Sequence, residues 1–159
     1  MVWIPTDVTI EEIEPGAELA GADLSGAELG GADLGGADIE GANLSGADLG
    51  GSCLADVNLA GANLENAVLR ESDLDGAVLQ DANLAGADLR GVSFPKLSNL
   101  SGADLSGATL EDGELPYADL SGATVRDANL KRVDLQGADL GRADLRDADL
   151  YDASLEETH

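Results

Sequence analysis

The chain has 159 residues and a formal net charge of −24, from 32 acidic and 8 basic residues. Such a surface repels nucleic acid and anionic membranes, so we expect no direct contact with either, and any protein partner should be basic. No apolar run approaches the roughly 20 residues of a membrane span, and no signal peptide pattern opens the chain. The single cysteine, Cys53, excludes an internal disulfide, and cytoplasm is the expected location.

Residues 1–16 lie outside the repetitive part of the chain. Apolar residues such as Trp3, Ile4 and Ile13 occur among polar ones, and Pro5 and Pro15 bound the segment. A stack of repeats exposes its first layer unless something covers it. We therefore interpret residues 1–16 as an N-terminal cap, the alternative being a recognition arm built on Trp3.

From Ala17 onward, one phrase of five residues, Ala-Asp/Asn-Leu-X-Gly, recurs to Leu155. A period of five fits neither a helix, where the leucines would spiral around the axis, nor a continuous strand, where they would alternate between faces. The chain must therefore turn once per repeat. This predicts an all-β solenoid in which Leu and the Ala two places before it point inward and the other three residues point outward.

The last place of each phrase predicts the geometry of the corners. It is Gly in 15 of 28 repeats, and Asn or Asp in 7 more. These residues tolerate the positive φ that a type II turn requires.

The repeats form one domain, 17–157, with a single interruption. The phrase slips by one residue at Pro95, Lys96 and Leu97, and it then continues to the end of the domain.

The tandem A-[DN]-L-X-X phrase resembles the pentapeptide repeat family over residues 17–157. The resemblance implies a right-handed quadrilateral β-helix with four repeats per coil, and about seven coils in all. It also implies that residues 20 apart form columns on the four sides.

Two such columns contain unusual residues. One places Arg70, Arg90 and Lys131 in line, and we interpret this basic stripe as offsetting neighbouring aspartates. The other contains apolar residues at the slipped corner. This corner is either a covered bulge or a surface that docks a protein partner, and the candidate interaction residues are Pro95, Lys96, Leu97, Pro116 and Tyr117.

The sequence contains no pattern of residues for catalysis. The only histidine is His159, no Cys/His cluster could bind zinc, and no basic residue near Cys53 could activate its thiol. The many carboxylates recur at a fixed place in the repeat, which indicates a structural role. We therefore expect a protein that is not an enzyme and has no catalytic residue, metal or cofactor.

Three interpretations of function remain. The chain is a scaffold or protein-interaction module with an acidic surface. Alternatively, it is a DNA mimic, since some members of the family that it resembles confer quinolone resistance by binding DNA gyrase, a DNA-binding enzyme. Thirdly, the acidity is an adaptation to high salt, which is compatible with either role.

The C-terminal end predicts self-association. Only four residues follow Leu155, too few to cover the last coil, and an uncovered edge pairs readily with another chain. We expect a homodimer through this end, and the candidate interface residues are Leu140, Leu145, Leu150 and Leu155. The alternatives are that the chain is a piece of a longer protein or that water covers the edge.

Overall fold

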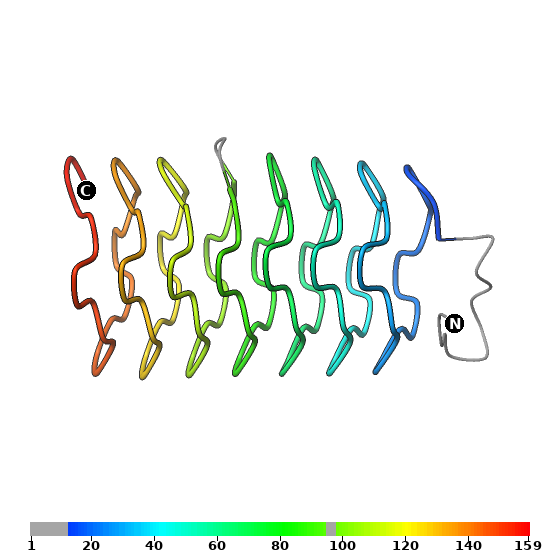
Figure 1. The fold of residues 1–159 in the computed structure, drawn as a ribbon, viewed down its shortest axis with the longest axis horizontal. Coiled ribbons are helices and arrows are strands. Elements are labelled where there is room, and N and C mark those ends of the chain that lie inside the picture. The colour runs from blue at the N-terminus through cyan, green and yellow to red at the C-terminus, as the bar shows by residue number, and fades with distance from the viewer. Residues whose placement is uncertain (1–12, 95–97) are drawn as a thin grey trace.

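The computed structural model describes residues 13–94 and 98–159. These residues form one stack of coils, with the earliest and the latest described segments at opposite ends of the long axis (Figure 1). The described part contains no helix and no strand longer than a single bridge residue. The predicted segment 95–97, where the phrase slips, and most of the predicted cap, including Trp3, Ile4 and Pro5, lie outside the described residues.

One residue per repeat, directly before each Leu, pairs with its equivalent on the next coil. The bridges are all parallel and join residues 20 apart, as in Asp23 with Asn43 and Asn43 with Asn63. Twenty residues contain four repeats, so each coil has four corners. The spacing rises to 21 from Val78↔Asn99 to Ser93↔Glu114 and then returns to 20. A single extra residue between Phe94 and Asn99 is therefore absorbed without disturbing the pairing on either side.

Backbone hydrogen bonds explain why the repeat has this form. In the repeat around Leu24, the Leu24 amide donates to the Asn43 carbonyl at 2.7 Å, and the Asn43 amide donates to the Ala22 carbonyl at 2.9 Å. The corner is closed by the Ala27 amide, which donates to the Leu24 carbonyl at 3.0 Å. The same set of hydrogen bonds recurs along the stack. It pairs buried backbone N–H and C=O groups, which would destabilise the fold if they were left unpaired.

Every described corner has the predicted positive φ, between 55° and 74°. Glycine, asparagine and aspartate occupy most of these corners. Glu71, Tyr117, Arg132, Arg142 and Glu157 also adopt this conformation. Because bulky residues rarely do so, the stack itself must hold these five in place.

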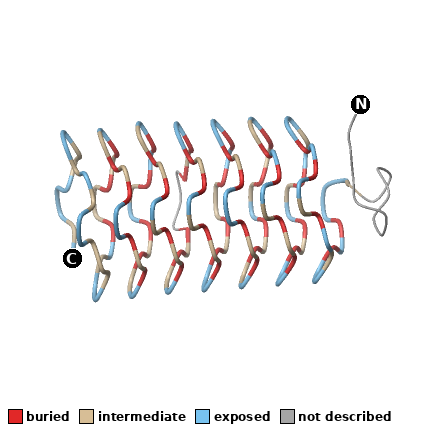
Figure 2. Cartoon of the chain, turned by 90° about the horizontal axis from the view of Figure 1, so that it is seen from below, coloured by how far each residue is buried: buried red, intermediate tan, exposed pale blue. Residues whose placement is uncertain are grey.

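The interior consists of the Leu and Ala columns, as predicted from the phrase. Figure 2 shows buried segments alternating with exposed corners around every described coil except the last. Leu84 and Phe94 are completely buried, and the described leucines before Leu140 are all buried. The last coil differs, since Leu140, Leu145 and Leu150 are only partly buried.

The inside and outside positions are tested by placing aspartate at two neighbouring residues. Leu84→Asp puts an unpaired charge in the core, and we expect it to lower the free energy of unfolding by about 4 kcal/mol or more. Ala85→Asp adds the same charge at an outward position and should change stability by less than about 0.5 kcal/mol. Urea denaturation followed by circular dichroism measures both. Similar losses would contradict the assignment.

Candidate interaction surface

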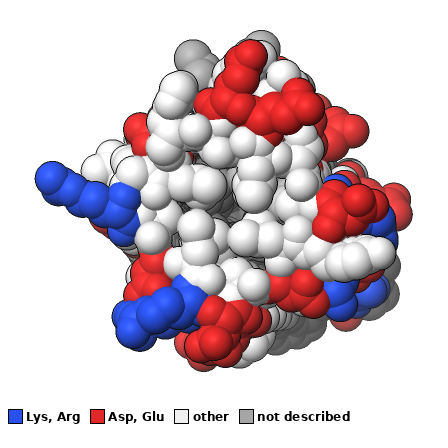
Figure 3. Space-filling model, turned by 90° about the vertical axis from the view of Figure 1, so that its left-hand side faces the viewer, with Lys and Arg blue, Asp and Glu red and all other residues white. Residues whose placement is uncertain are grey.

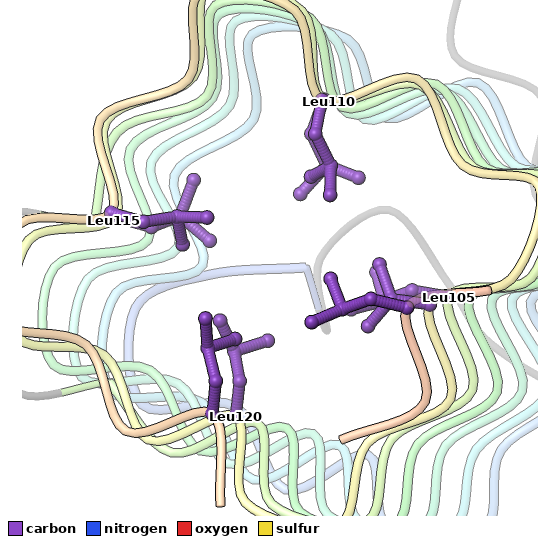
Figure 4. Close-up of a pocket in the computed structure, with 9 residues that line it drawn as sticks. Leu105, Leu110, Leu115 and Leu120 are labelled. Carbon is purple, nitrogen blue, oxygen red and sulfur yellow. The ribbon is translucent and has the colours of Figure 1, made fainter. Parts of the chain in front are cut away.

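The interior of the described coils is filled mainly by aliphatic side chains. A cavity of about 10 Å³ lies along the axis, and its lining is entirely aliphatic: Leu105, Leu110, Leu115, Leu120, Val125, Leu130, Leu135, Leu140 and Leu145 (Figure 4). That volume is about the least that holds one water molecule, and the lining side chains carry no polar atom to bind one. Within residues 13–94 and 98–159, no group of His, Cys, Asp or Glu could bind a metal ion. Over the same residues no helix is long and apolar enough to cross a membrane.

The outward carboxylates and amides beside each Leu support the backbone. The Oδ1 atom of Asp48 accepts a hydrogen bond from the Gly50 amide at 2.9 Å, and the Oδ1 atom of Asp104 accepts one from the Ser106 amide at 2.9 Å. The same bond to the residue two places later recurs at many bridge positions. The turn that follows therefore favours Asp and Asn at this place, although residues such as Val68 and Thr109 also occupy it.

One side of the stack carries a ladder of amides. Asn43 donates from Nδ2 to Asp23 at 3.1 Å, Asn63 donates to Asn43 at 3.3 Å, and Asn83 donates to Asn63 at 3.0 Å. Asn43 and Asn63 thus each give one bond to the coil before and accept one from the coil after, and the ladder ends at Asn83. Sequence reasoning missed this ladder, although the recurrence of Asn every 20 residues is a visible signal for it.

The basic stripe forms ion pairs within the chain, in agreement with its interpretation as charge compensation. Arg90 donates to both oxygens of Asp88, at 2.9 and 2.8 Å, and Arg70 donates to the same carboxylate at 2.5 Å. Arg90 first, and then Arg70, lowers the pKa of Asp88 to about 2. Lys131 pairs with Asp149 at 3.1 Å.

Two further clusters were not anticipated. Asp144 lies between Arg146 and Arg126, which lower the pKa of its carboxyl. Arg132, at positive φ, donates to Asp112 and Glu111, and these carboxylates raise the pKa of its guanidinium. A signal in the sequence was available, because residues 18 to 21 apart lie on adjacent coils.

The ion pairs divide the molecule into two unlike parts. Residues 13–69 contain no Lys or Arg, whereas every ion pair within the described residues lies between Arg70 and Asp149. The carboxylates of the first part therefore have no cation from the described chain. This part offers a basic partner the stronger negative potential.

The predicted interaction corner is described only in part. Pro95, Lys96 and Leu97 lie outside the described residues. Tyr117 is 51% exposed, and Pro116 beside it is partly exposed. The Tyr117 ring lies across Gly137 on the following coil, where a Cβ atom would overlap it. Two described members of the predicted set are thus neighbours on the surface.

The C-terminal end exposes apolar surface, as predicted. Leu155 is 41% exposed, and the rim of the same coil carries Tyr151, which is 72% exposed. Figure 3 views this end and shows uncharged atoms at its centre, with acidic and basic side chains around them. His159 pairs with Ala138 and Leu140 through its backbone. Cys53, a partly exposed free thiol, lies at a bridge position between Asp33 and Asp73.

The ion pair at Asp88 predicts a dependence of stability on pH. The lowered pKa means that the stabilisation is fully present above the unfolded value of about 3.9 and is lost as the pH falls through about 2. Asp88→Asn should therefore cost about 1 kcal/mol at pH 7, a modest value because both arginines are half exposed. The cost should shrink below pH 4.

Asp48→Asn is the matched control, since Asp48 occupies the same column and has no arginine partner among the described residues. Asparagine retains the oxygen that accepts the turn amide at both positions. Urea denaturation from pH 2 to pH 7 measures the difference between the two variants. An equal effect of both substitutions at pH 7 would show that the arginines contribute no stability through Asp88.

Comparison with known proteins identifies the repeat. A family model described as pentapeptide repeats matches in eight copies, over residues 17–56, 52–91, 98–127 and 128–159. No curated protein matches the sequence.

Solved structures have the same repeat. A trypsin-treated form of QnrB1, a plasmid-mediated fluoroquinolone resistance protein, is 26% identical with a TM-score of 0.52, over 90% of this chain and 78% of that one. A pentapeptide repeat protein from the Arabidopsis thaliana thylakoid lumen is 33% identical over 71% of each chain, with a TM-score of 0.33. HetL from Nostoc sp. strain PCC 7120, a pentapeptide repeat protein involved in heterocyst differentiation regulation, is 29% identical over 93% of this chain and 87% of that one, with a TM-score of 0.26. The chain belongs to the pentapeptide repeat family.

Proposed function

We propose that this protein is a non-enzymatic scaffold or interaction module whose acidic surface binds a basic protein. The observation that carries the proposal is the stretch 13–69, in which outward carboxylates recur on every coil without any Lys or Arg. The corners of this stretch are mostly glycines with open space around them, so a partner could approach the backbone closely. The geometry that supports the proposal is a right-handed quadrilateral β-helix of about seven coils.

A DNA mimic that binds DNA gyrase or a related topoisomerase is a second candidate. Its support is the 26% identity to QnrB1, a fluoroquinolone resistance protein. Charge density also favours it. Seven coils at the strand spacing span about 34 Å, over which B-DNA carries about 20 charges. The net charge of −24 is comparable.

The two candidates predict different results with DNA gyrase. The mimic should inhibit the enzyme, and a scaffold should not. In a gyrase supercoiling assay, the mimic should inhibit at protein concentrations equal to those of the enzyme, and increasing salt should weaken the inhibition because the contact is between charges. The control is a variant with Asp23, Asp33, Asp38 and Asp48 changed to Asn, which keeps the turn acceptors and removes four charges. No inhibition, with folding that requires high salt, would favour a scaffold whose acidity is a salt adaptation.

We also propose that two copies of this chain associate through the coil that contains Leu140, Leu145, Leu150 and Leu155. Support comes from the exposure of Leu155 and Tyr151, and from the amides of Leu145 and Leu150, which have no backbone partner among the described residues. An unpaired edge of this kind can pair with a second copy about a two-fold axis.

Association through this end should depend on salt. Arg142 has no ion-pair partner within the described residues, whereas Asp147 and Asp152 occupy other corners of the same coil. A two-fold arrangement can pair Arg142 with an acidic corner of the other copy, but the remaining corners repel. We therefore expect the mass from light scattering to rise from 16.1 kDa toward twice that value as salt increases. Leu150→Glu should abolish the rise, and a constant mass at all salt and protein concentrations would refute the dimer.

A further inference from the structure

We propose that the corner formed by Pro116 and Tyr117, the Tyr117 corner, binds an arginine side chain of a basic protein partner. This inference rests on the proposed function and adds to it the place and the chemistry of recognition. Three features carry it: the conformation of Tyr117, the support beneath its ring and the charge of the side on which it lies.

Tyr117 is held in a conformation that a tyrosine seldom adopts. Its φ is 60°, and its amide donates to the Gln136 carbonyl of the next coil at 2.8 Å. A glycine occupies the equivalent place in many other repeats, so the turn does not require an aromatic residue here. Strain at an exposed residue that the fold does not need is a reason to look for a role in binding.

The ring of Tyr117 is supported by the following coil. It lies across Gly137, which has no side chain to displace it, while half of the residue stays exposed. An aromatic ring that is already fixed loses little conformational entropy when a partner covers its open face. Rigid, exposed tyrosines are typical anchors of protein interfaces.

The described part of the side around the Tyr117 corner carries no positive charge, and Lys96, which belongs to the same side, lies outside the described residues. This side consists of the outward residues of the fourth repeat in each coil. Its described members include no Lys or Arg, and the acidic ones are Asp33, Asp56, Asp73, Asp75, Glu114, Asp134, Glu156 and Glu157. Glu114 is exposed and contacts no described cation. The described basic residues all belong to the other three repeats of each coil.

An aromatic face within an acidic side favours a guanidinium group. Arginine stacks on an aromatic ring and pairs with carboxylates through the same planar group, whereas the ammonium of lysine is a compact and strongly hydrated charge. The acidic side attracts either residue. The ring should therefore add a preference for arginine over lysine.

The experiment uses the full chain with fluorescent deca-arginine and deca-lysine peptides, at about 0.15 M salt. We expect the protein to bind deca-arginine more tightly. Tyr117→Asn should lower the affinity for deca-arginine about two- to fivefold, the range of an exposed cation–π contact, and should remove most of the preference. Asparagine tolerates positive φ, so the turn is kept.

A further pair of variants keeps Tyr117 and moves its ring. Gly137→Ala places a methyl group where the ring lies, and Gly122→Ala makes the same change at a corner with nothing nearby. The φ angles, 67° and 69°, are almost equal, so the backbone cost is matched. Only Gly137→Ala should weaken the binding of deca-arginine, and melting temperatures establish that both variants are folded.

Two results would overturn the inference. Equal effects of Gly137→Ala and Gly122→Ala, or equal affinity of the unaltered protein for the two peptides, would mean that the acidic surface binds cations without the Tyr117 corner, and the proposed function would stand. If neither peptide binds, the acidic surface does not recognise basic chains and the proposed function fails as well.

Discussion

The left-handed corner is the constraint on which the rest of this structure depends. One residue in five has positive φ, and this turns the chain so that consecutive leucines point to the same axis. Only then can the bridge residue between them pair with its equivalents on both neighbouring coils. The core, the pairing and the outward carboxylates therefore all follow from a torsion angle that ordinary residues avoid.

The corners are also connected along the stack. Where Asp56, Asp81 or Tyr117 replaces glycine, its side chain lies over a glycine on the next coil, namely Gly76, Gly102 or Gly137. The missing Cβ leaves the space for that side chain. Glycine in this protein thus has two functions, since it adopts positive φ and also accommodates a neighbour. The second function explains why Gly137 and Gly122, with similar φ, are unequal sites for substitution.

The fold was predictable from the sequence because two features of the repeat, its period and the residue type at its last place, determine it. Period five excluded helix and continuous strand, and Gly, Asn or Asp at the last place indicated the turn, as the φ angles confirm. The corners at Tyr117 and Arg132 were not predictable, because no local preference places these residues at positive φ. Their conformation is imposed by pairing with coils 20 residues away, which a five-residue phrase does not encode.

Predictions about the surface were less complete, for a related reason. The column of Arg70, Arg90 and Lys131 was recognised as charge compensation, but Asp88 as the shared acceptor of two arginines was not. The sequence shows which residues share a column. It does not show whether an arginine extends along its own coil, as Arg90 does, or toward the next, as Arg70 does.

The offset of 18 residues between paired charges has a consequence for how such a chain can grow. Arg70–Asp88, Arg126–Asp144 and Lys131–Asp149 each join one coil to the next. Inserting four repeats between two pairs leaves every later residue on its original side. Inserting one, two or three would rotate all later residues by a quarter, a half or three quarters of a revolution, and the amide ladder would then face unrelated columns. Gene duplications that keep this surface intact should therefore come in units of 20 codons, whereas the single extra residue before Asn99 leaves the later residues on their original sides.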